Sequence, residues 1–279
     1  MKKRLIINAD DFGLNDAATD AIAECYLNGT VTSTTMMVNS PGLARAADFA
    51  ISNPGLGVGL HFNLTWGRPV SKAEKVPSLV SQDGVFHSRD VLAKKLLLRQ
   101  VPVKEIKAEL EAQLDRFRQL GLEPSHIDSH QHVHAFNPVF SLVANSCRKL
   151  SIPIRVPWVS SEPSASLARR LRRLVLRWLL YRSTRSWNKK LIWNNQLGSV
   201  FDVSSLGLPI RDDHYRYILS HFEGGVFELM VHPVTSSSAM DGFTGIGEIS
   251  ESEWAYLRQR KILTIVKELD FELITYRDI

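Results

Sequence analysis

The sequence predicts an α/β protein with a single barrel-like domain, in which about seven β/α units form a mostly parallel, closed or nearly closed sheet. Short apolar runs alternate with helical patterns along the chain, as is typical of parallel sheets with crossover helices. The 279 residues, 44% of them hydrophobic, are enough to bury one substantial core. We therefore expect one domain over residues 1–279.

Seven strands are predicted from short runs rich in apolar or β-branched residues. The first, Leu5 to Ala9, is typical of a strand that is buried on both faces. Gly57 and Gly59 in the third run indicate that another backbone or a ligand comes close. Pro157 would interrupt the hydrogen-bond ladder of the fifth run. The predicted strands are 5–9, 31–38, 56–64, 126–131, 154–159, 226–231 and 271–276.

Helical patterns follow most of these strands. Asn15 is placed to cap a helix that runs to about Asn28, and Asn137-Pro138 predicts a second helix with a cap and a proline at its first position. Residues 65–87 exceed the usual loop length, which favours a functional lid. Further helices are expected from Pro41 to about 53 and over 88–99, 102–120 and 251–269.

The composition argues against several classes of protein. The formal charge of +5 is not a nucleic-acid signature, and no recognised nucleic-acid module is visible. Cys25 and Cys147 are the two cysteines, which favours reduced thiols over a disulfide framework. The apolar run before Asn8 is too short for an export signal, and no stretch of about 18 uncharged apolar residues predicts a membrane span. We expect a cytoplasmic protein.

Three separated segments carry side chains of the kind that hold a divalent metal, at residues 10–13, 59–63 and 128–134. Asp10 and Asp11 follow the first predicted strand, and parallel α/β folds collect their sites at the carboxyl ends of strands. Two adjacent carboxylates point in different directions, so one can bind a metal while the other accepts a proton from water. The alternative is that one of them caps the following helix.

His61 lies in the third predicted strand. Because side chains alternate along a strand, Gly57, Gly59, His61 and Asn63 share one face. The two glycines leave open space around the imidazole, which favours a metal ligand over an ordinary core histidine.

The segment 128–134 is the strongest single signal. Asp128, His130, His132 and His134 alternate along what reads as an extended chain. Since they cannot all bind one ion, we predict His130 as the ligand and Asp128 and His134 as residues near the site. A surface cluster of histidines is the alternative.

His232 ends the apolar strand at 226–231 and is followed by Pro233. A histidine in this place could protonate a leaving group, because its unperturbed pKa lies near neutrality. The alternative is a loop histidine that is bonded to the backbone.

The segments 8–14, 31–35, 59–65 and 128–134 resemble motifs of the YdjC-like carbohydrate deacetylases, and 231–233 and 276–278 also fit. The resemblance runs from about residue 4 to the C-terminus and is weakest between 155 and 225. It implies a (β/α)-barrel-like fold, a divalent metal and removal of acetyl groups from N-acetylated sugars such as chito-oligosaccharides. By this resemblance Asp11, His61 and His130 would hold the metal, and Asp10 would be the base.

The hypothesis that follows is a metal-dependent hydrolase for an N-acetylated sugar, either a chito-oligosaccharide or a lipid-linked amino sugar. Asp10 would activate water, His232 would protonate the departing amine, and Asn63 would contact substrate or support the site. Which of Asp10 and Asp11 is the base stays open. Mixed nitrogen and oxygen ligands suit several ions, and we expect one ion, Mg²⁺ or Zn²⁺.

Two other functions stay open. Two metals about 3.5–4 Å apart would favour another metal hydrolase, such as a phosphoesterase. A non-catalytic membrane-surface protein with a vestigial site is the second alternative. A homodimer is compatible with the sequence.

Residues 164–187 form a basic segment, with seven arginines between 169 and 185. Its apolar residues repeat at helical spacing, so we predict an amphipathic helix that packs on the barrel with its arginines in solvent. Contact with an anionic membrane surface through 167–187 is the alternative. Some relatives in the family that the chain resembles are associated with hopanoid lipid biosynthesis. The apolar positions are Leu167, Leu171, Leu174, Trp178 and Tyr181.

Overall fold

The computed structural model describes residues 3–158, 167–187, 190–222 and 224–279. One curled sheet has the order β4-β3-β2-β1-β6-β5, and β7 pairs with β1. Neighbouring strands of this sheet all run parallel. The strands are β1 (Lys3–Phe12), β2 (Ser33–Met36), β3 (Gly57–Phe62), β4 (Ile127–Ser129), β5 (Gln196–Gly198), β6 (Gly225–Val231) and β7 (Phe271–Leu273).

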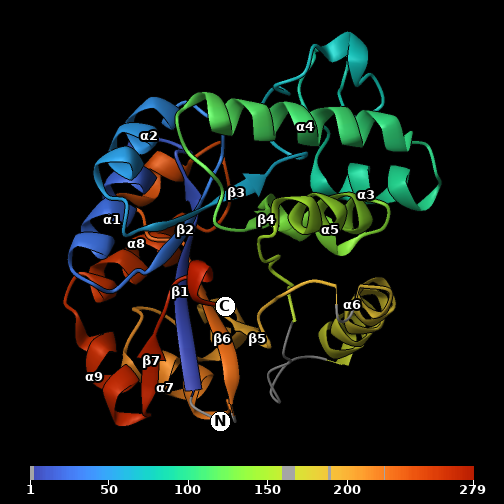
Figure 1. Cartoon of the computed structure of the whole chain (residues 1–279). Helices are drawn as coiled ribbons and strands as arrows, with labels where there is room; N and C mark the ends of the chain where they lie inside the picture. Colours follow the sequence, from blue (N-terminus) through green and yellow to red (C-terminus); the bar gives the residue numbers. More distant parts are fainter. Residues whose placement is uncertain (1–2, 159–166, 188–189, 223) are drawn as a thin grey trace.

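Helices cover the outside of the sheet (Figure 1). The short 3₁₀ helix η2 (His130–Ala135) directly follows β4. Apolar side chains of the strands and helices form one large core that extends from β1 to α9. The α-helices of the described residues are α1 (Asp16–Leu27), α2 (Leu43–Ser52), α3 (Arg89–Leu97), α4 (Val103–Gln119), α5 (Val139–Leu150), α6 (Leu167–Arg185), α7 (Asp212–Ser220), α8 (Gly247–Leu257) and α9 (Lys261–Glu268).

Two single-residue bridges join the edges of the curled sheet. Ile154 bridges in parallel to Ile127 of β4 and to Trp193, which lies just before β5. The prediction of a nearly closed, mostly parallel barrel is therefore confirmed. The strand expected over 154–159 is reduced to this bridge in the described residues, consistent with the missing backbone N–H of Pro157.

β1 occupies the middle of the sheet and is buried along most of its length. Its first residues pair with β7, its last residues pair with β2, and β6 lies along its other edge. The strand extends past the predicted end at Ala9, so Asp10 and Asp11 belong to its carboxyl end. Asp11 has a φ of 66°, a left-handed conformation that aspartate tolerates better than most residues.

Local signals predicted some element boundaries correctly and missed others. The Asn15 side chain accepts a hydrogen bond from Ala18 N at 2.8 Å and caps α1 as predicted, so neither Asp10 nor Asp11 is the cap. The cap predicted at Asn137 is wrong, because Pro138 takes that position without a side-chain bond. The expected helix over 251–269 is two helices, α8 and α9, separated where Arg260 has a φ of 61°.

The chain turns after β4, contrary to the extended segment expected over 126–131. It enters η2 at His130, and Gln131 and His132 adopt left-handed backbone conformations with φ of 53° and 55°. The alternation predicted for His130, His132 and His134 is therefore wrong. After the turn His130 and His132 line the cavity described below, whereas His134 is bonded to Ser129 and to the backbone of Arg155.

Residues 65–87 are fixed to α4 by buried carboxylates. Glu109 accepts hydrogen bonds from the backbone N–H groups of Val70 and Ser71, each at 2.9 Å, and Glu105 accepts one from Ser78 N at 2.8 Å. No residue of this loop lines the cavity described below. The loop is bound to α4 and does not form the predicted lid.

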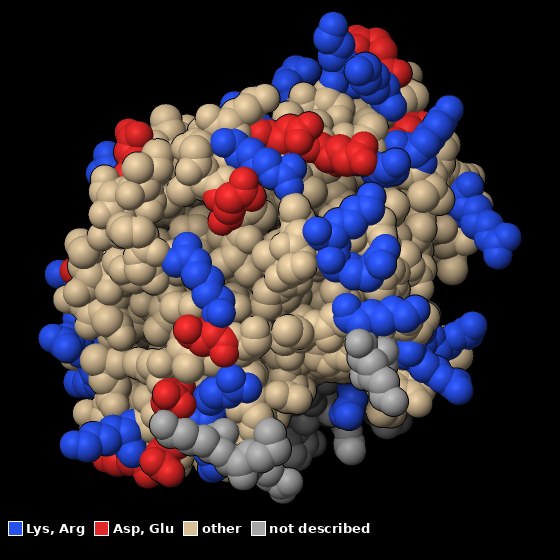
Figure 2. Space-filling model, viewed as in Figure 1, with Lys and Arg blue, Asp and Glu red and all other residues tan. Residues whose placement is uncertain are grey.

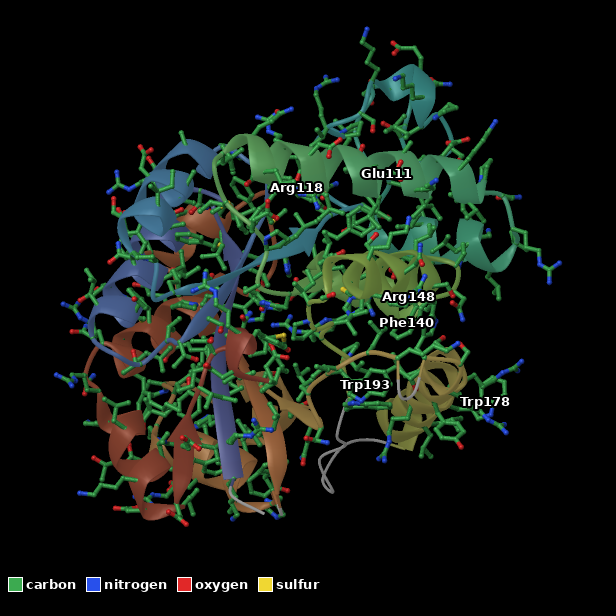
Figure 3. The ribbon with its side chains drawn as sticks, in the orientation of Figure 1. Glu111, Arg118, Phe140, Arg148, Trp178 and Trp193 are labelled. Atoms are coloured by element: carbon green, nitrogen blue, oxygen red, sulfur yellow. The ribbon has the colours of Figure 1, made fainter. Side chains whose placement is uncertain are left out.

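Helix α6 (Leu167–Arg185) is present within the predicted basic segment, whose residues 164–166 lie outside the described ones, but it does not pack as expected. The stripe members Leu171, Leu174, Trp178 and Tyr181 are 54–61% exposed, and the helix is anchored by buried Leu180 instead. Figure 3 shows Trp178 on the outer side of α6. The prediction that the stripe packs on the barrel is wrong, because the buried side of the helix is offset from it.

The charged surface is mixed. Figure 2 shows acidic and basic side chains interspersed over the visible face, with Lys and Arg prevailing on its right-hand side. Among the described residues, no helix is both long enough and apolar enough to cross a membrane.

Candidate metal site and its buried charge network

A cavity of about 290 Å³ opens at the carboxyl ends of the strands. In parallel α/β folds this end of the sheet carries the functional residues. Its described lining residues are Asp10, Asp11, His61, Arg89, His130, Gln131, His132, Phe201, Met230, His232, Thr244 and Ile246.

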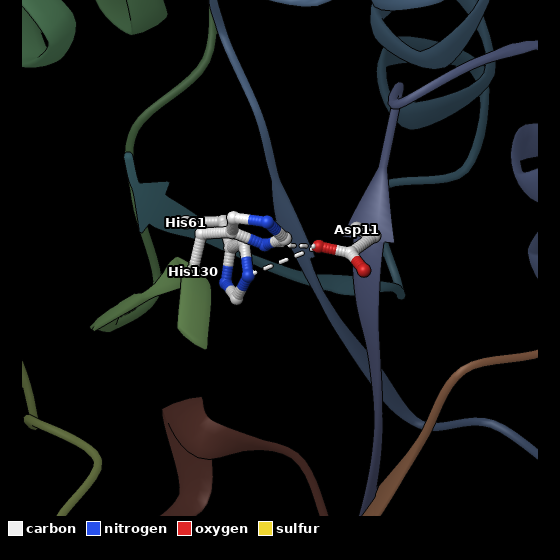
Figure 4. Close-up of side chains that lie close together, drawn as sticks. All are labelled: Asp11, His61 and His130. Carbon is white, nitrogen blue, oxygen red and sulfur yellow. Dashed lines mark hydrogen bonds and ion pairs between the residues drawn. The ribbon is translucent and has the colours of Figure 1, made fainter. Parts of the chain in front are cut away.

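The three side chains predicted to share one ion lie together in this cavity. Asp11 Oδ1 is 3.2 Å from His61 Nε2 and 2.9 Å from His130 Nδ1 (Figure 4). One ligand atom from each residue lies within 4.8 Å of the others. The residues come from β1, β3 and η2, and all three are buried. Two imidazole nitrogens and one carboxylate oxygen form a donor set that suits a divalent ion and leaves coordination positions for solvent.

Asp128 orients His61. Its Oδ1 lies 2.7 Å from His61 Nδ1, which leaves Nε2 directed at Asp11. Histidines that bind metals usually have such a carboxylate on their second nitrogen. Burial alone would lower the pKa of His61, but the Asp128 charge and hydrogen bonds to Asp11 and Asp128 raise it to about 10. The position between the two carboxylates therefore favours a positive charge, as a cation site requires.

Asp11 is held in its ionised form. Burial raises the pKa of a carboxyl group, but the charge of His130 and hydrogen bonds from His130 and His61 bring the pKa of Asp11 well below its usual value. An ionised carboxylate is available as a ligand at neutral pH. Asp11 therefore has the protonation state of a metal ligand as well as the position of one.

A second group, Asp10, His61 and Asp128, also has ligand atoms within 4.8 Å of one another. Arg155 occupies its carboxylates, with Nη1 2.5 Å from Asp128 Oδ2 and 2.7 Å from Asp10 Oδ2. A metal cation beside a buried guanidinium would be repelled. The group of Asp11, His61 and His130 is thus the better metal site.

Arg155 was not predicted, and it is the centre of the site's charge network. It is fully buried, and it also donates from Nε to Glu228 Oε1 at 2.8 Å. The available signals were a lone arginine between Ile154 and Val156 and a lone glutamate inside the apolar strand at 226–231. Charges buried in apolar strands need partners, but the pattern did not reveal which ones.

Glu228 does not line the cavity, and the Tyr276 hydroxyl donates to its second oxygen. Burial raises the pKa of Glu228 to about 7, against the lowering effect of Arg155. One guanidinium thus faces three buried carboxylates, those of Asp10, Asp128 and Glu228. Of these three carboxyl groups, that of Glu228 is the most readily protonated.

His232 lies next to Asp10, with Nε2 3.8 Å from Asp10 Oδ2. Its backbone N donates to Glu253 Oε2 at 2.6 Å, and its ring packs edge-on against Phe201. Burial lowers the pKa of His232, although Asp10 and Asp11 raise it in part, so the ring is neutral at pH 7. Its Nδ1 has no hydrogen-bond partner among the residues that the structure describes, so the alternative of a backbone-bonded loop histidine is wrong.

Besides Asp128, which contacts His61 without lining the cavity, two predicted residues do not reach the cavity. The Asn63 side chain bonds to Asn39 and to the backbone of Thr65 and Trp66, which shapes the turn after β3. His134 contacts Ser129 Oγ and, at 3.0 Å, the carbonyl oxygen of Arg155. His134 therefore supports the Arg155 backbone, and its burial argues against a surface histidine cluster.

The glycines of β3 make room for side chains rather than for a ligand. A Cβ at Gly59 would lie 2.5 Å from the His126 ring, and one at Gly57 would lie 2.7 Å from Ser33 Oγ. The predicted open space beside His61 is thus filled, and the interpretation of a cleared face is wrong. The close approach of another backbone or a ligand, which the sequence predicted at both glycines, is wrong as well, because the near atoms belong to the side chains of His126 and Ser33.

Fold and site together define a class of protein: a parallel α/β barrel with a histidine–carboxylate cluster of metal-binding type at the carboxyl ends of its strands. The family model described as YdjC-like protein matches residues 4–268. The chain belongs to the YdjC-like family.

Relatives of known description cover the chain to different extents. A carbohydrate deacetylase of Geobacillus stearothermophilus is 44% identical over 279 residues, which is 100% of this chain and 98% of that protein. A chitooligosaccharide deacetylase of Proteus mirabilis is 46% identical over 157 residues, 56% of this chain and 60% of that protein. The chain thus matches only about three fifths of the latter relative's length.

A solved structure has the same overall fold. It is a protein of Enterococcus faecalis V583 described as a candidate for cellobiose-phosphate cleavage, with 29% sequence identity and a TM-score of 0.79. The match covers 100% of this chain and 99% of that chain. The curled parallel sheet is therefore the architecture of a solved relative as well.

Proposed function

We propose that this protein is a metal-dependent carbohydrate deacetylase that removes the acetyl group from an N-acetylated sugar. The observation that carries the proposal is the convergence of Asp11, His61 and His130 beside a second, separately held carboxylate, Asp10. Family membership and the deacetylases among the relatives support the same reaction class. Amide hydrolysis needs an activated water, a base and a proton donor, and the cavity offers residues for each role.

Asp11, His61 and His130 would hold one divalent ion. Bound there, the ion would polarise the acetamide carbonyl and lower the pKa of water. Ligand chemistry favours Mg²⁺ or Zn²⁺ without choosing between them. Asp128 would keep the His61 ring in its binding orientation through the contact at Nδ1.

Asp10 would act as the base. Arg155 donates a hydrogen bond to each of its oxygens. These contacts keep the carboxylate ionised and fix its direction next to the cation site. Burial raises the pKa of Asp10, but the Arg155 charge outweighs this effect and lowers it overall. Asp11, by contrast, faces both histidines, which supports the role of ligand for Asp11 and of base for Asp10.

His232 would deliver the proton to the departing amine. Because its pKa is lowered, the ring carries no proton to give at rest. Its Nε2 lies 3.8 Å from Asp10 Oδ2, so the proton that Asp10 removes from water can reach it after a small movement. The proton then leaves with the amine, and both residues return to their starting states.

The substrate class that we propose is an N-acetylated amino sugar, either in a chito-oligosaccharide or linked to a lipid. Deacetylation of chito-oligosaccharides is supported by the description of the Proteus mirabilis relative. A phosphoesterase with two metals is less well supported, because Arg155 occupies the carboxylates of the second group. A cytoplasmic location, a homodimer and membrane contact through 167–187 stay predictions.

The test is release of acetate from N,N′-diacetylchitobiose. We expect activity that is lost with chelator and restored by Mg²⁺ or Zn²⁺, and lost in His61→Ala and in His130→Ala. His221 is an exposed histidine on the protein surface, and His221→Ala is the matched control that should keep wild-type activity. Full activity in both site variants would overturn the proposed site.

A further inference from the structure

A second cavity, of about 600 Å³, adjoins the one that holds the candidate metal site. The two share Phe201 and Thr244 in their linings. Both lie within the size range of small-molecule sites in proteins. A ligand bound at the metal site could therefore extend past Phe201 into the second cavity and stay in contact with the protein.

Three elements contribute to the wall of the second cavity: η3 (Val200–Leu206), η4 (Ser237–Met240) and the start of α8. The segments that follow η3 and η4, together with His214 of α7, complete it. A Cβ at Gly247 would lie 2.6 Å from the Ser237 carbonyl oxygen, so α8 and η4 meet closely. Phe201 stands at the junction, and its ring contacts His232 at a centroid distance of 5.4 Å. The second cavity thus begins directly beside the proposed proton donor.

The charge of this cavity has one sign. Asp241 and Glu248 are the aspartate and glutamate among its described lining residues, which include no lysine or arginine. Within the described part of the chain, neither carboxylate makes an ion pair. The remaining lining includes Val203, Leu208 and Phe201, which offer apolar surface. An occupant with apolar faces and a positive charge suits these surroundings better than an anion.

We propose that the second cavity binds the neighbouring sugar unit of the same substrate chain, and that it favours a unit with a free amino group. This inference rests on the proposed deacetylase function. A glucosamine unit has apolar ring faces and carries an ammonium group, which Asp241 and Glu248 would attract. The substrate class is then a partly deacetylated chito-oligosaccharide, with the N-acetylated unit at the metal site.

The first experiment measures binding without hydrolysis. The probe is the β-1,4-linked disaccharide of glucosamine, which has no acetyl group, and the method is calorimetry on the intact protein. We expect Asp241→Asn with Glu248→Gln to weaken binding by about fivefold to twentyfold, a range set by two exposed ion pairs. Cellobiose, which has no amino group, should bind equally to both proteins.

Matched controls remove the same charges elsewhere. Glu111 and Asp115 are exposed on α4, and Glu111→Gln with Asp115→Asn should leave binding of the glucosamine disaccharide unchanged. Equal binding to the wild type and to the cavity double variant would overturn the proposal. An equal loss of binding in the α4 control would also overturn it, since net charge alone would then explain the effect.

A second variant fills the cavity without touching its carboxylates. A Cβ at Gly245 would meet no atom within 4 Å, so a larger side chain fits there. We expect Gly245→Phe to weaken binding of the disaccharide and to raise the KM for N,N′-diacetylchitobiose. The kcat/KM for single N-acetylglucosamine should fall less than that for N,N′-diacetylchitobiose. Unchanged disaccharide binding in this variant would overturn the second cavity as a sugar site.

These outcomes separate the two proposals. Charge-dependent binding in a protein that releases no acetate would keep the sugar site and reject the deacetylase. If the protein releases acetate but none of the cavity variants changes disaccharide binding, the deacetylase proposal stands and the sugar site is rejected.

Discussion

Arg155 and Asp10 form a buried two-point ion pair, with Nη1 2.7 Å from Oδ2 and Nη2 2.6 Å from Oδ1. Both side chains are almost completely inaccessible to water. A planar guanidinium that binds both carboxylate oxygens fixes the carboxylate's plane as well as its charge. Asp10 is therefore held rigidly beside the candidate metal ligands, although it makes no bond to Asp11.

We expect Arg155→Met to destabilise the protein by about 3–5 kcal/mol, because it leaves buried carboxylates without their cation. Urea unfolding at pH 7 measures the change. The control is Arg216→Met, which removes an exposed ion pair with Glu268 and should cost less than about 1 kcal/mol. Similar losses in the two variants would contradict a structural role for the buried network.

We expect Asp128→Asn to weaken metal binding by about tenfold to hundredfold, because His61 loses the carboxylate that orients its ring. Calorimetric titration with Zn²⁺ measures the affinity, and circular dichroism verifies folding at the same temperature. Asp115→Asn, an exposed change on α4, is the control. Wild-type affinity in the Asp128 variant would show that His61 needs no such partner.

We expect Glu253→Gln to flatten the dependence of stability on pH. Burial raises the pKa of Glu253 from 4.5 to about 7. Between these values the folded state binds more protons than the unfolded state, so the free energy of unfolding falls as the pH rises. The fall amounts to at most about 3 kcal/mol and is complete above pH 7.

The measurement for Glu253 is urea unfolding at a series of pH values between 4.5 and 8. The difference in the free energy of unfolding between the wild type and Glu253→Gln should change across this window. The exposed control Glu111→Gln should show the same pH dependence as the wild type. The amide can still accept from His232 N, so the variant is expected to fold. Parallel curves for wild type and Glu253→Gln would show that Glu253 titrates normally.

We expect His232→Ala to lower kcat by about 10²–10⁴-fold with little change in KM, the usual contribution of a positioned proton donor. An acetylated aromatic amine has a less basic leaving group, which needs less help from a proton donor. The kcat for its hydrolysis should therefore fall less in His232→Ala. Acetate release from the sugar and from the aromatic amide measures both effects. Equal losses for the two substrates would exclude His232 as the donor to the departing amine.

Much of the fold could be predicted from local patterns. The apolar runs at 5–9 and 226–231 became β1 and β6, and the Asn15 cap was found because its signal lies within one helical turn. Boundaries were less accurate. The chain leaves β4 at His130 and breaks the helix near Arg260 through left-handed backbone conformations that the residue types there do not demand.

The sequence by itself determined most of the elements, though not β5 or α7, and which strand ends carry Asp11, His61 and His130, because alternation and apolar runs are local properties of the chain. Only the tertiary structure decided that Arg155, Glu228 and Asp10 are partners, that Asn63 serves a turn, and that Phe201 joins two cavities. Pairing of buried charges depends on which distant segments meet in space, and no short-range pattern encodes that distance.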